Sequence, residues 1–380
     1  MVPHDSVVRL TGLDTLRAIA IVHVVLAHGA MAFMPDLPGI SGHVVWLLIA
    51  TNFGVPLFFV LSGFLITRQL ASGIPVTTFY RHRLAKIYPM FVLAVIVFGW
   101  LNGVTDARVW LLHLTALHNG SASISSGMSG HLWSLAVEIQ FYALAPMLFW
   151  AAYRWLRPRS IAALAVVVWI GHAAYLLGAP PTQEARLAAL LNVYQFTSFN
   201  IVALLMGAML YRAQAEGQAW RGALPLGLVA ALAMPLICML VIPSLRADQA
   251  DLTQTASVLA LLTLITLPPV ASVCLAYLTL RRNWFSGPRW RPVAAFIAAI
   301  SYQWYLWHPL VLLGTHRLAT RSPEVGAWMQ SRPWLTLLGY VVSSALLGWL
   351  SFRWLERPLH RWLLSRPKRD KGLTKQPTSG

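Results

Sequence analysis

The chain has 380 residues, of which 57% are hydrophobic and only 11% are charged, and its mean hydropathy is +0.62. A soluble domain carries about a quarter charged residues, so this composition excludes an ordinary soluble protein and indicates a polytopic membrane protein. The net charge of +17 does not indicate a nucleic-acid-binding protein, because the basic residues are not clustered. Cys238 and Cys274 lie in apolar runs, which suggests neither a disulfide framework nor a metal site.

Apolar runs of about 17–25 residues mark membrane-spanning helices. The sequence contains ten such runs, at residues 15–34, 44–66, 87–102, 132–153, 161–178, 193–211, 223–243, 255–279, 293–314 and 335–353. The first run follows Asp5 and Asp14, carries Arg17 near its start and contains two histidines, so we expect a retained helix rather than a cleaved signal peptide. The sequence therefore predicts an all-α membrane helix bundle with about ten transmembrane helices.

The distribution of basic residues predicts the orientation of the bundle. With the N-terminus in the cytoplasm, 23 of the 29 Lys and Arg residues fall in cytoplasmic segments and 6 fall in outer loops. Both termini are therefore predicted to be cytoplasmic. We expect residues 1–358 to form a single transmembrane domain and residues 359–380 to form a basic, polar, disordered tail that can contact anionic lipid.

The first predicted span, GLDTLRAIAIVHVVLAHGA, carries Arg17, His23 and His28 within an apolar run. Arg17 and His28 are eleven residues apart, so on an α-helix they share one face and lie about 16 Å apart along the axis. His23 lies on another face. Titratable groups inside a membrane indicate a functional site. The alternatives are that Arg17 is a topological anchor and that His28 is a hydrogen-bonded histidine between helices.

A second polar segment, FYRHRLAKIYP, places Arg81 and Arg83 in a predicted short inner loop. Arginine binds phosphate through two parallel hydrogen bonds. An Arg-x-Arg pair beside Arg17 at the inner membrane face could therefore hold a polyanionic ligand. The alternative, a purely topological charge, explains the number of basic residues but not their pairing.

A third polar segment, SGHLWSLAVEIQFYALAP, places Glu138 about seven residues below the outer end of its helix, at the depth predicted for His28. A buried carboxylate needs a partner. We therefore predict that Glu138 faces His28 or is linked to it by a short polar chain. The alternative is a structural hydrogen bond to the helix backbone, to Trp133 or to Tyr142.

These segments together resemble the acyltransferase-3 family of integral membrane O-acyltransferases. The matching stretches are GLDTLRAIAIVHVVLAH, VPLFFVLSGFLIT, YRHRLAKIYP, HLWSLAVEIQFYALAP, SYQWYLWHPL and WLERPL, in the order of the family and across residues 12–358. Some members carry a fused extracytoplasmic hydrolase-like domain that has no counterpart here, so we expect its contribution to be absent or supplied by another protein.

The resemblance implies roles for individual residues. Arg17 and His28 match an essential Arg-x10-His element, Arg81 and Arg83 match an Arg-x-Arg element, and Glu138 matches a glutamate of the fourth helix. The implied cosubstrate is acyl-CoA, most simply acetyl-CoA, with no permanently bound cofactor or metal. We expect the three arginines to hold its phosphates and His28, supported by Glu138, to act as general base. A covalent acyl-His28 intermediate remains open.

The implied acceptor is a hydroxyl of a sugar on a surface polysaccharide, a lipid-linked oligosaccharide or a related glycoconjugate, at the cytoplasmic membrane of a bacterium. The residues expected to line the cavity or meet the acceptor are His131, Ser134, Ser301, Tyr302 and Tyr305. A proton-coupled transporter that uses His28 and Glu138 as a relay is the alternative. The sequence shows no inverted repeat typical of transporters, and the arginine cluster has no evident task in a simple carrier.

Three remaining features are expected to be structural. Ser62 and Gly63, near the inner end of the second run, are small residues that are expected to allow close helix packing, with contact to a ligand as the alternative. His308 is expected to pack at a helix interface. Glu356 is expected to form an ion pair with Arg357.

Overall fold

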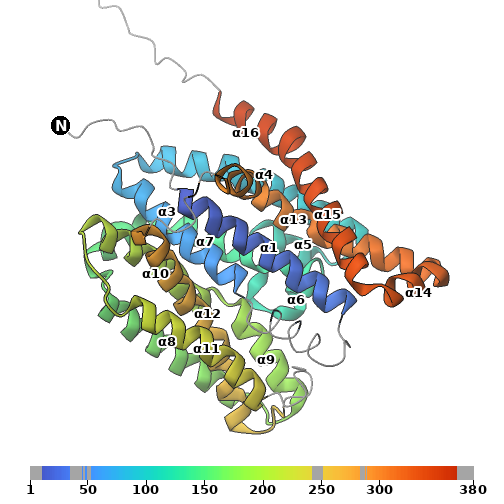
Figure 1. Ribbon diagram of the computed structural model, residues 1–380, viewed down its shortest axis with the longest axis horizontal. Coiled ribbons are helices and arrows are strands. Elements are labelled where there is room, and N and C mark those ends of the chain that lie inside the picture. Colours follow the sequence, from blue (N-terminus) through green and yellow to red (C-terminus); the bar gives the residue numbers. More distant parts are fainter. Residues whose placement is uncertain are drawn as a thin grey trace, which may run out of the picture.

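A computed structural model describes residues 11–34, 45, 48, 53–241, 251–282, 287 and 289–365. Within these ranges the chain is built from helices and contains no strand (Figure 1). Eight helical segments of the described part are long and apolar enough to cross a membrane. The predicted all-α polytopic membrane bundle is therefore confirmed.

The ten predicted runs coincide with ten long helices. These are α1 (Thr11–Phe33), α3 (Gly54–Ala71), α4 (Val76–Leu101), α7 (Trp133–Ala152), α8 (Pro158–Gly178), α10 (Thr197–Ala215), α11 (Ala223–Val241), α12 (Thr255–Arg282), α13 (Arg291–Arg321) and α15 (Pro333–Ser351). Helices α11 and α13 are not among the eight apolar segments, since α11 is shorter in its described part and α13 carries many polar residues. The number of ten spans stays a prediction. Most of residues 44–52, assigned to the second run, lie outside the described residues.

Shorter helices connect these long ones. They are α5 (Ala107–Leu114), η1 (His118–Gly120), α6 (Ala122–Ser126), η2 (Gly130–Leu132), η3 (Tyr153–Trp155), α9 (Gln183–Gln195), α14 (Pro323–Ser331), η5 (Phe352–Glu356) and α16 (Arg357–Leu364). Helix α16 corrects the predicted tail, because the chain remains helical to Leu364. Its sequence, RPLHRWLL, places basic and apolar residues on different faces, which is typical of a helix at a membrane surface. Residues 366–380 of the predicted tail lie outside the described residues.

Helix α1 lies in the middle of the bundle and packs against α3, α13 and α15 (Figure 1). Helices α8, α10, α11 and α12 pack on one another on one side of it, and α13, α15 and α16 lie on the other side. Many apolar side chains point outward from α8, α11 and α15, among them Val167, Leu232 and Val342. Such apolar outer faces suit contact with lipid.

Two contacts fix the relative direction of α1 and α13. The Arg17 guanidinium donates to the hydroxyl of Ser301 at 3.5 Å, and the His28 ring meets the His308 ring at 2.8 Å. Residue numbers rise together along both helices, so the two helices run in the same direction. In a chain that crosses the membrane ten times, the first and ninth spans must run in the same direction, as α1 and α13 do.

Two glycines bring α3 and α10 into close contact. A Cβ atom at Gly63 would lie 1.8 Å from the carbonyl oxygen of Leu204, and one at Gly207 would lie 1.9 Å from that of Val60. No side chain other than hydrogen fits at such distances, so the predicted packing role of Gly63 is confirmed.

Replacing Gly63 with Ala is expected to force α3 away from α10 and to lower the free energy of unfolding by about 1–3 kcal/mol, as overpacked sites do. The unfolding temperature of the detergent-solubilised protein measures this. Gly171→Ala in α8 is the matched control, because nothing lies within 4 Å of a Cβ atom at that glycine. Equal unfolding temperatures for the two variants would contradict the close contact.

The segment between α4 and α7, which is a predicted outer loop, holds a pair of buried histidines. The rings of His113 and His118 stack with centroids 4.0 Å apart, and the ring of Phe91 lies against His118. Burial lowers the pKa of both histidines, and in His118 the neighbouring His113 lowers the pKa further, to about 3. Both rings are therefore neutral at neutral pH.

The stability of the protein is expected to fall as the pH falls below about 6.5, the pKa of an unfolded histidine. Below this pH the histidine binds a proton in the unfolded chain, whereas His118 in the folded protein stays neutral until the pH approaches about 3. The free energy of unfolding therefore falls by about 2 kcal/mol between neutral pH and pH 5. Unfolding temperatures between pH 7.5 and pH 5 measure it. In His118→Phe, which keeps the ring stack, the decline should be shallower, and an unchanged decline would contradict the assignment.

Candidate active site

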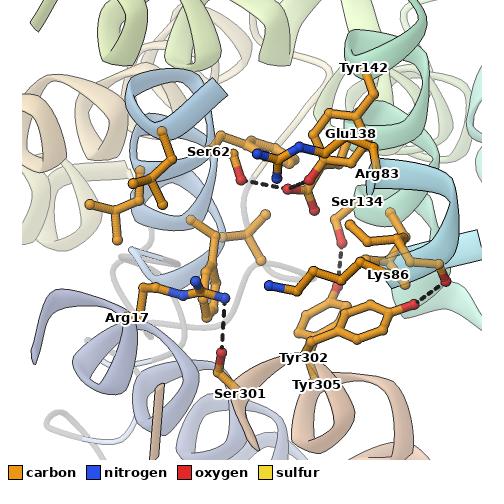
Figure 2. A pocket seen from close by; sticks show the side chains of 17 residues that line it. Arg17, Ser62, Arg83, Lys86, Ser134, Glu138, Tyr142, Ser301, Tyr302 and Tyr305 are labelled. Carbon is orange, nitrogen blue, oxygen red and sulfur yellow. Dashed lines mark hydrogen bonds between the residues drawn. The ribbon is translucent and has the colours of Figure 1, made fainter. Parts of the chain in front are cut away.

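A cavity lies within the bundle between α1, α3, α4, α7 and α13 (Figure 2). Its polar lining residues are Arg17, Ser62, Arg83, Lys86, Ser134, Glu138, Tyr142, Ser301, Tyr302 and Tyr305. Apolar side chains, mostly from α3, complete the wall. Polar and charged groups deep in a membrane bundle mark a functional site, so this cavity is the candidate active site.

Three cationic side chains converge on the cavity. Arg17 comes from α1, and Arg83 and Lys86 come from one face of α4, since residues three apart on a helix are neighbours. Figure 2 shows the ammonium group of Lys86 directed toward Arg17. Arg83 donates to the side-chain oxygen of Gln69, while its buried Nε has no hydrogen-bond partner among the described residues. This cluster suits a phosphorylated or otherwise polyanionic ligand.

The sequence did not predict Lys86 as a site residue, and it predicted Arg81 in an inner loop beside Arg83. Both differences from the structure have the same physical reason. The segment that was expected to be a loop is the first part of α4, which begins at Val76. Residues two apart on a helix point about 200° apart. Arg83 therefore reaches the cavity, whereas Arg81 is exposed and donates to the carbonyl oxygen of Leu364 on α16.

The structure does not pair Glu138 with His28, which corrects the prediction. Glu138 accepts hydrogen bonds from the hydroxyl of Ser62 at 2.5 Å and from the hydroxyl of Tyr142. The bond to Tyr142 is one of the structural alternatives that the sequence left open. His28 instead meets His308 because α13, and not α7, packs against α1 at this depth.

Three histidines lie together beyond the cavity. His28 is half-buried, His308 is completely buried, and the ring centroid of His131 lies 5.5 Å from that of His308. His131 bonds to the hydroxyl of Ser129 at 2.8 Å and to the carbonyl of Leu306 at 3.2 Å. It is not among the residues that line the cavity, and its expected contact with the acceptor stays a prediction. His308 was expected to be a packing residue. It does lie buried where α13 meets α1, and the sequence signal for a further role is a titratable residue within the predicted run 293–314.

Tyr305 separates the cavity from these histidines. Its hydroxyl lies 2.5 Å from the hydroxyl of Ser134 and donates to the carbonyl of His131 at 2.7 Å. Tyr305 and His308 are three residues apart on α13, so about one helical turn separates the end of the cavity from the histidine pair. Of the five residues predicted to line the cavity or meet the acceptor, Ser134, Ser301, Tyr302 and Tyr305 line the cavity.

A second cavity adjoins the first and shares Arg17, Lys86 and Tyr302 with it. Asp14 and Glu356 also line this second cavity. The two shared cations therefore stand between the two spaces. The predicted ion pair at Glu356 is not what the structure shows there.

Glu356 instead accepts from the side-chain amide of Gln303 at 2.8 Å. The guanidinium of Arg357 stands over the ring of Phe352, 5.8 Å from its centroid. The bond to Gln303 ties η5, which follows α15, to α13.

The fold and the site together define an integral membrane helix bundle with a cationic internal cavity and a neighbouring histidine pair. A family model described as an acyltransferase domain matches residues 10–353. The chain therefore belongs to this family, the acyltransferase-3 family, as the sequence motifs indicated.

Several curated proteins are similar to parts of the chain. The "Nodulation protein 10" of Rhizobium leguminosarum bv. viciae is 31% identical over 182 residues, which cover 41% of this chain and 49% of that protein. "Acyltransferase MdmB" of Streptomyces mycarofaciens is 30% identical over 37% of this chain and 39% of its own length. "Peptidoglycan O-acetyltransferase OatA" of Listeria monocytogenes is 24% identical over 92% of this chain and 55% of its own length.

The chain thus spans about half the length of these curated relatives, or less. No solved structure matches the chain.

Proposed function

We propose that the protein is a membrane O-acyltransferase that moves an acyl group, most simply acetyl, from cytoplasmic acyl-CoA to a hydroxyl of a sugar. The observation that carries this proposal is the convergence of Arg17, Arg83 and Lys86 on one cavity in a chain of the acyltransferase family. CoA carries several phosphates, and such groups need cationic partners when they leave water.

In the proposed reaction, the cavity cations hold the phosphates of the donor at the inner end of the bundle. The pantetheine arm extends along α1 toward His28, which lies about 16 Å from Arg17 along the helix axis. For the thioester to approach His28, the contact between Tyr305 and Ser134 has to open, because these two side chains stand at the end of the cavity.

His28 is the proposed general base. The oxygen of the acceptor hydroxyl attacks the thioester carbon, a carbon–oxygen bond forms, and the carbon–sulfur bond breaks. His28 takes the hydroxyl proton and returns it to the departing thiolate, so that CoA leaves as a thiol. Imidazole suits this exchange because it can hold and release a proton near neutral pH.

Glu138 is proposed to organise the cavity rather than to support His28. Its carboxylate accepts from two hydroxyl groups and lines the same cavity as Arg17, Arg83 and Lys86. One negative charge among three positive charges reduces their mutual repulsion when no donor is bound. The cavity still keeps an excess of positive charge for an anionic ligand.

The proposed acceptor is a sugar hydroxyl of a surface polysaccharide, a lipid-linked oligosaccharide or a related glycoconjugate at a bacterial cytoplasmic membrane. The name of one relative, a peptidoglycan O-acetyltransferase, supports a carbohydrate acceptor. A transporter that uses His28 and Glu138 as a direct proton relay gains no support, since the two side chains bond to different partners.

The test compares membranes that contain the protein with membranes that lack it, after incubation with acetyl-CoA labelled in the acetyl group. We expect labelled ester on glycan, together with O-acetyl groups in the surface glycans of the producing cells by mass spectrometry. Uptake of label without transfer would favour a carrier. Glycans that do not change when the gene is removed would contradict the proposed function.

A further inference from the structure

The contact between His28 and His308 is a directed hydrogen bond. His28 Nδ1 and His308 Nε2 are 2.8 Å apart, the ring planes differ by 6°, and the ring centroids are 5.0 Å apart. This centroid distance is close to the nitrogen–nitrogen distance plus the radii of the two rings. The rings therefore meet edge to edge in nearly one plane, with the two nitrogens facing each other, and do not lie one on top of the other.

The next residue in the chain, Pro309, decides which nitrogen of His308 carries the hydrogen. In a regular helix the carbonyl of Tyr305 would accept from the backbone N–H of residue 309. Proline has no N–H, so this carbonyl is released. His308 Nδ1 lies 2.7 Å from it and 3.3 Å from the carbonyl of Trp304. Carbonyl oxygens only accept, so Nδ1 of His308 is the protonated nitrogen.

This assignment determines the state of His28. A neutral imidazole has one donor and one acceptor nitrogen. Since Nδ1 of His308 donates, Nε2 of His308 must accept, and the donor that faces it is Nδ1 of His28. The lone pair of His28 is therefore left on Nε2, at the opposite side of its ring. We propose that His308 is a positioning residue that fixes His28 in the Nδ1–H tautomer, so that Nε2 is the nitrogen that takes the acceptor proton.

The catalytic role of Nε2 rests on the proposed function, whereas the tautomer of His28 follows from the hydrogen bonds alone. When Nε2 of His28 gains a proton, the Nδ1–H bond to His308 is kept, and the bond from His308 to the Tyr305 carbonyl polarises the chain in the same direction. The orienting partner is a neutral ring rather than the carboxylate found in many histidine triads. A neutral ring stabilises the imidazolium form of His28 less than a carboxylate would. This favours transfer of the proton from His28 to the departing thiolate.

The other titratable groups near the pair are accounted for. His131 lies beside His308 and bonds to Ser129 and to the backbone. His23, on another face of α1, lies at 3.3 Å from the N–H of Gly54. Tyr340 of α15 packs against Phe33 near the end of α1.

The first test measures the tautomer directly and needs no activity. Protein labelled with ¹⁵N in its histidines is placed in lipid bilayers, and solid-state NMR identifies the His28 signals by their loss in His28→Gln. We expect a protonated Nδ1 and an unprotonated Nε2 for His28 in the wild type. In His308→Phe we expect the population to move toward the Nε2–H form. A wild-type His28 protonated on Nε2 alone would overturn the proposal.

The second test measures acetyl transfer. His308→Phe removes the acceptor and should lower kcat by about 10²–10⁴-fold, the range seen when a catalytic histidine loses its orienting partner. The KM for acetyl-CoA should not change, because the cavity cations are untouched. His308→Gln should recover part of the lost kcat, because its amide can accept from His28 and donate to Tyr305. His316→Phe, an exposed position on the same helix, is the matched control.

Pro309→Ala provides a milder variant that keeps both histidines. It restores a backbone N–H that competes for the Tyr305 carbonyl, so we expect a smaller fall in kcat than in His308→Phe and a shifted pH profile of kcat. Wild-type kcat and pH profile in both His308→Phe and Pro309→Ala would overturn the proposal. If the wild-type protein transfers no acyl group at all, the proposed function fails, and the NMR result still decides the tautomer.

Discussion

Replacing His28 with Gln is expected to lower kcat for acetyl transfer by about 10²–10⁴-fold, the usual contribution of a general base. Glutamine has nearly the size of histidine and can keep a hydrogen bond to His308, but it cannot take a proton from the acceptor hydroxyl. The donor phosphates are proposed to bind about 16 Å away along α1. Binding of acetyl-CoA, measured by calorimetry on the detergent-solubilised protein, should therefore remain at the wild-type level.

His23→Gln is the matched control for this variant. His23 lies on the same helix, on another face, and its ring nitrogen faces the N–H of Gly54, to which a glutamine oxygen can also bond. We expect its transfer rate to stay close to that of the wild type. Full transfer by His28→Gln would remove His28 from the reaction, and equal losses in both variants would indicate damage to α1 instead.

The helices could be predicted from the sequence because lipid demands long apolar runs. The prediction failed at the start of α4, which was expected at residue 87 and lies at Val76. Because Arg83 and Lys86 are charged, hydropathy alone assigns them to the loop before the helix. In the structure they are helical and point into the cavity, where charged groups need not meet lipid. A helix that faces an internal site can therefore look shorter in the sequence than it is.

Spacing along one helix could be predicted, but partners on other helices could not. Arg17 and His28 were expected to share a face, and both contact α13, through Ser301 and His308. The partner of His28 was sought by depth alone. Glu138 has a suitable depth, but depth does not say which helix lies next to α1. That neighbour is set by the packing of the whole bundle.

Replacing Arg83 with Met is expected to raise the Kd for acetyl-CoA by about 10- to 100-fold, since a charge-assisted hydrogen bond contributes about 1.5–3 kcal/mol. Methionine keeps much of the apolar stem of arginine and removes the charge. The effect should fall on donor binding, with kcat at saturating donor close to the wild-type value, because His28 lies at the far end of the proposed path. Calorimetric titration with acetyl-CoA and saturation kinetics measure the two quantities.

Arg81→Met is the matched control, because the same substitution is made two residues away on the same helix. Arg81 is exposed and bonds to the backbone of α16, so its loss should leave the Kd close to that of the wild type. The two arginines therefore separate two explanations of the Arg-x-Arg element. Equal weakening in both variants would indicate that the element acts as a unit through general positive charge. An effect confined to Arg83 would follow from the orientation of α4 about its axis, because only the guanidinium group of Arg83 then faces the bound donor.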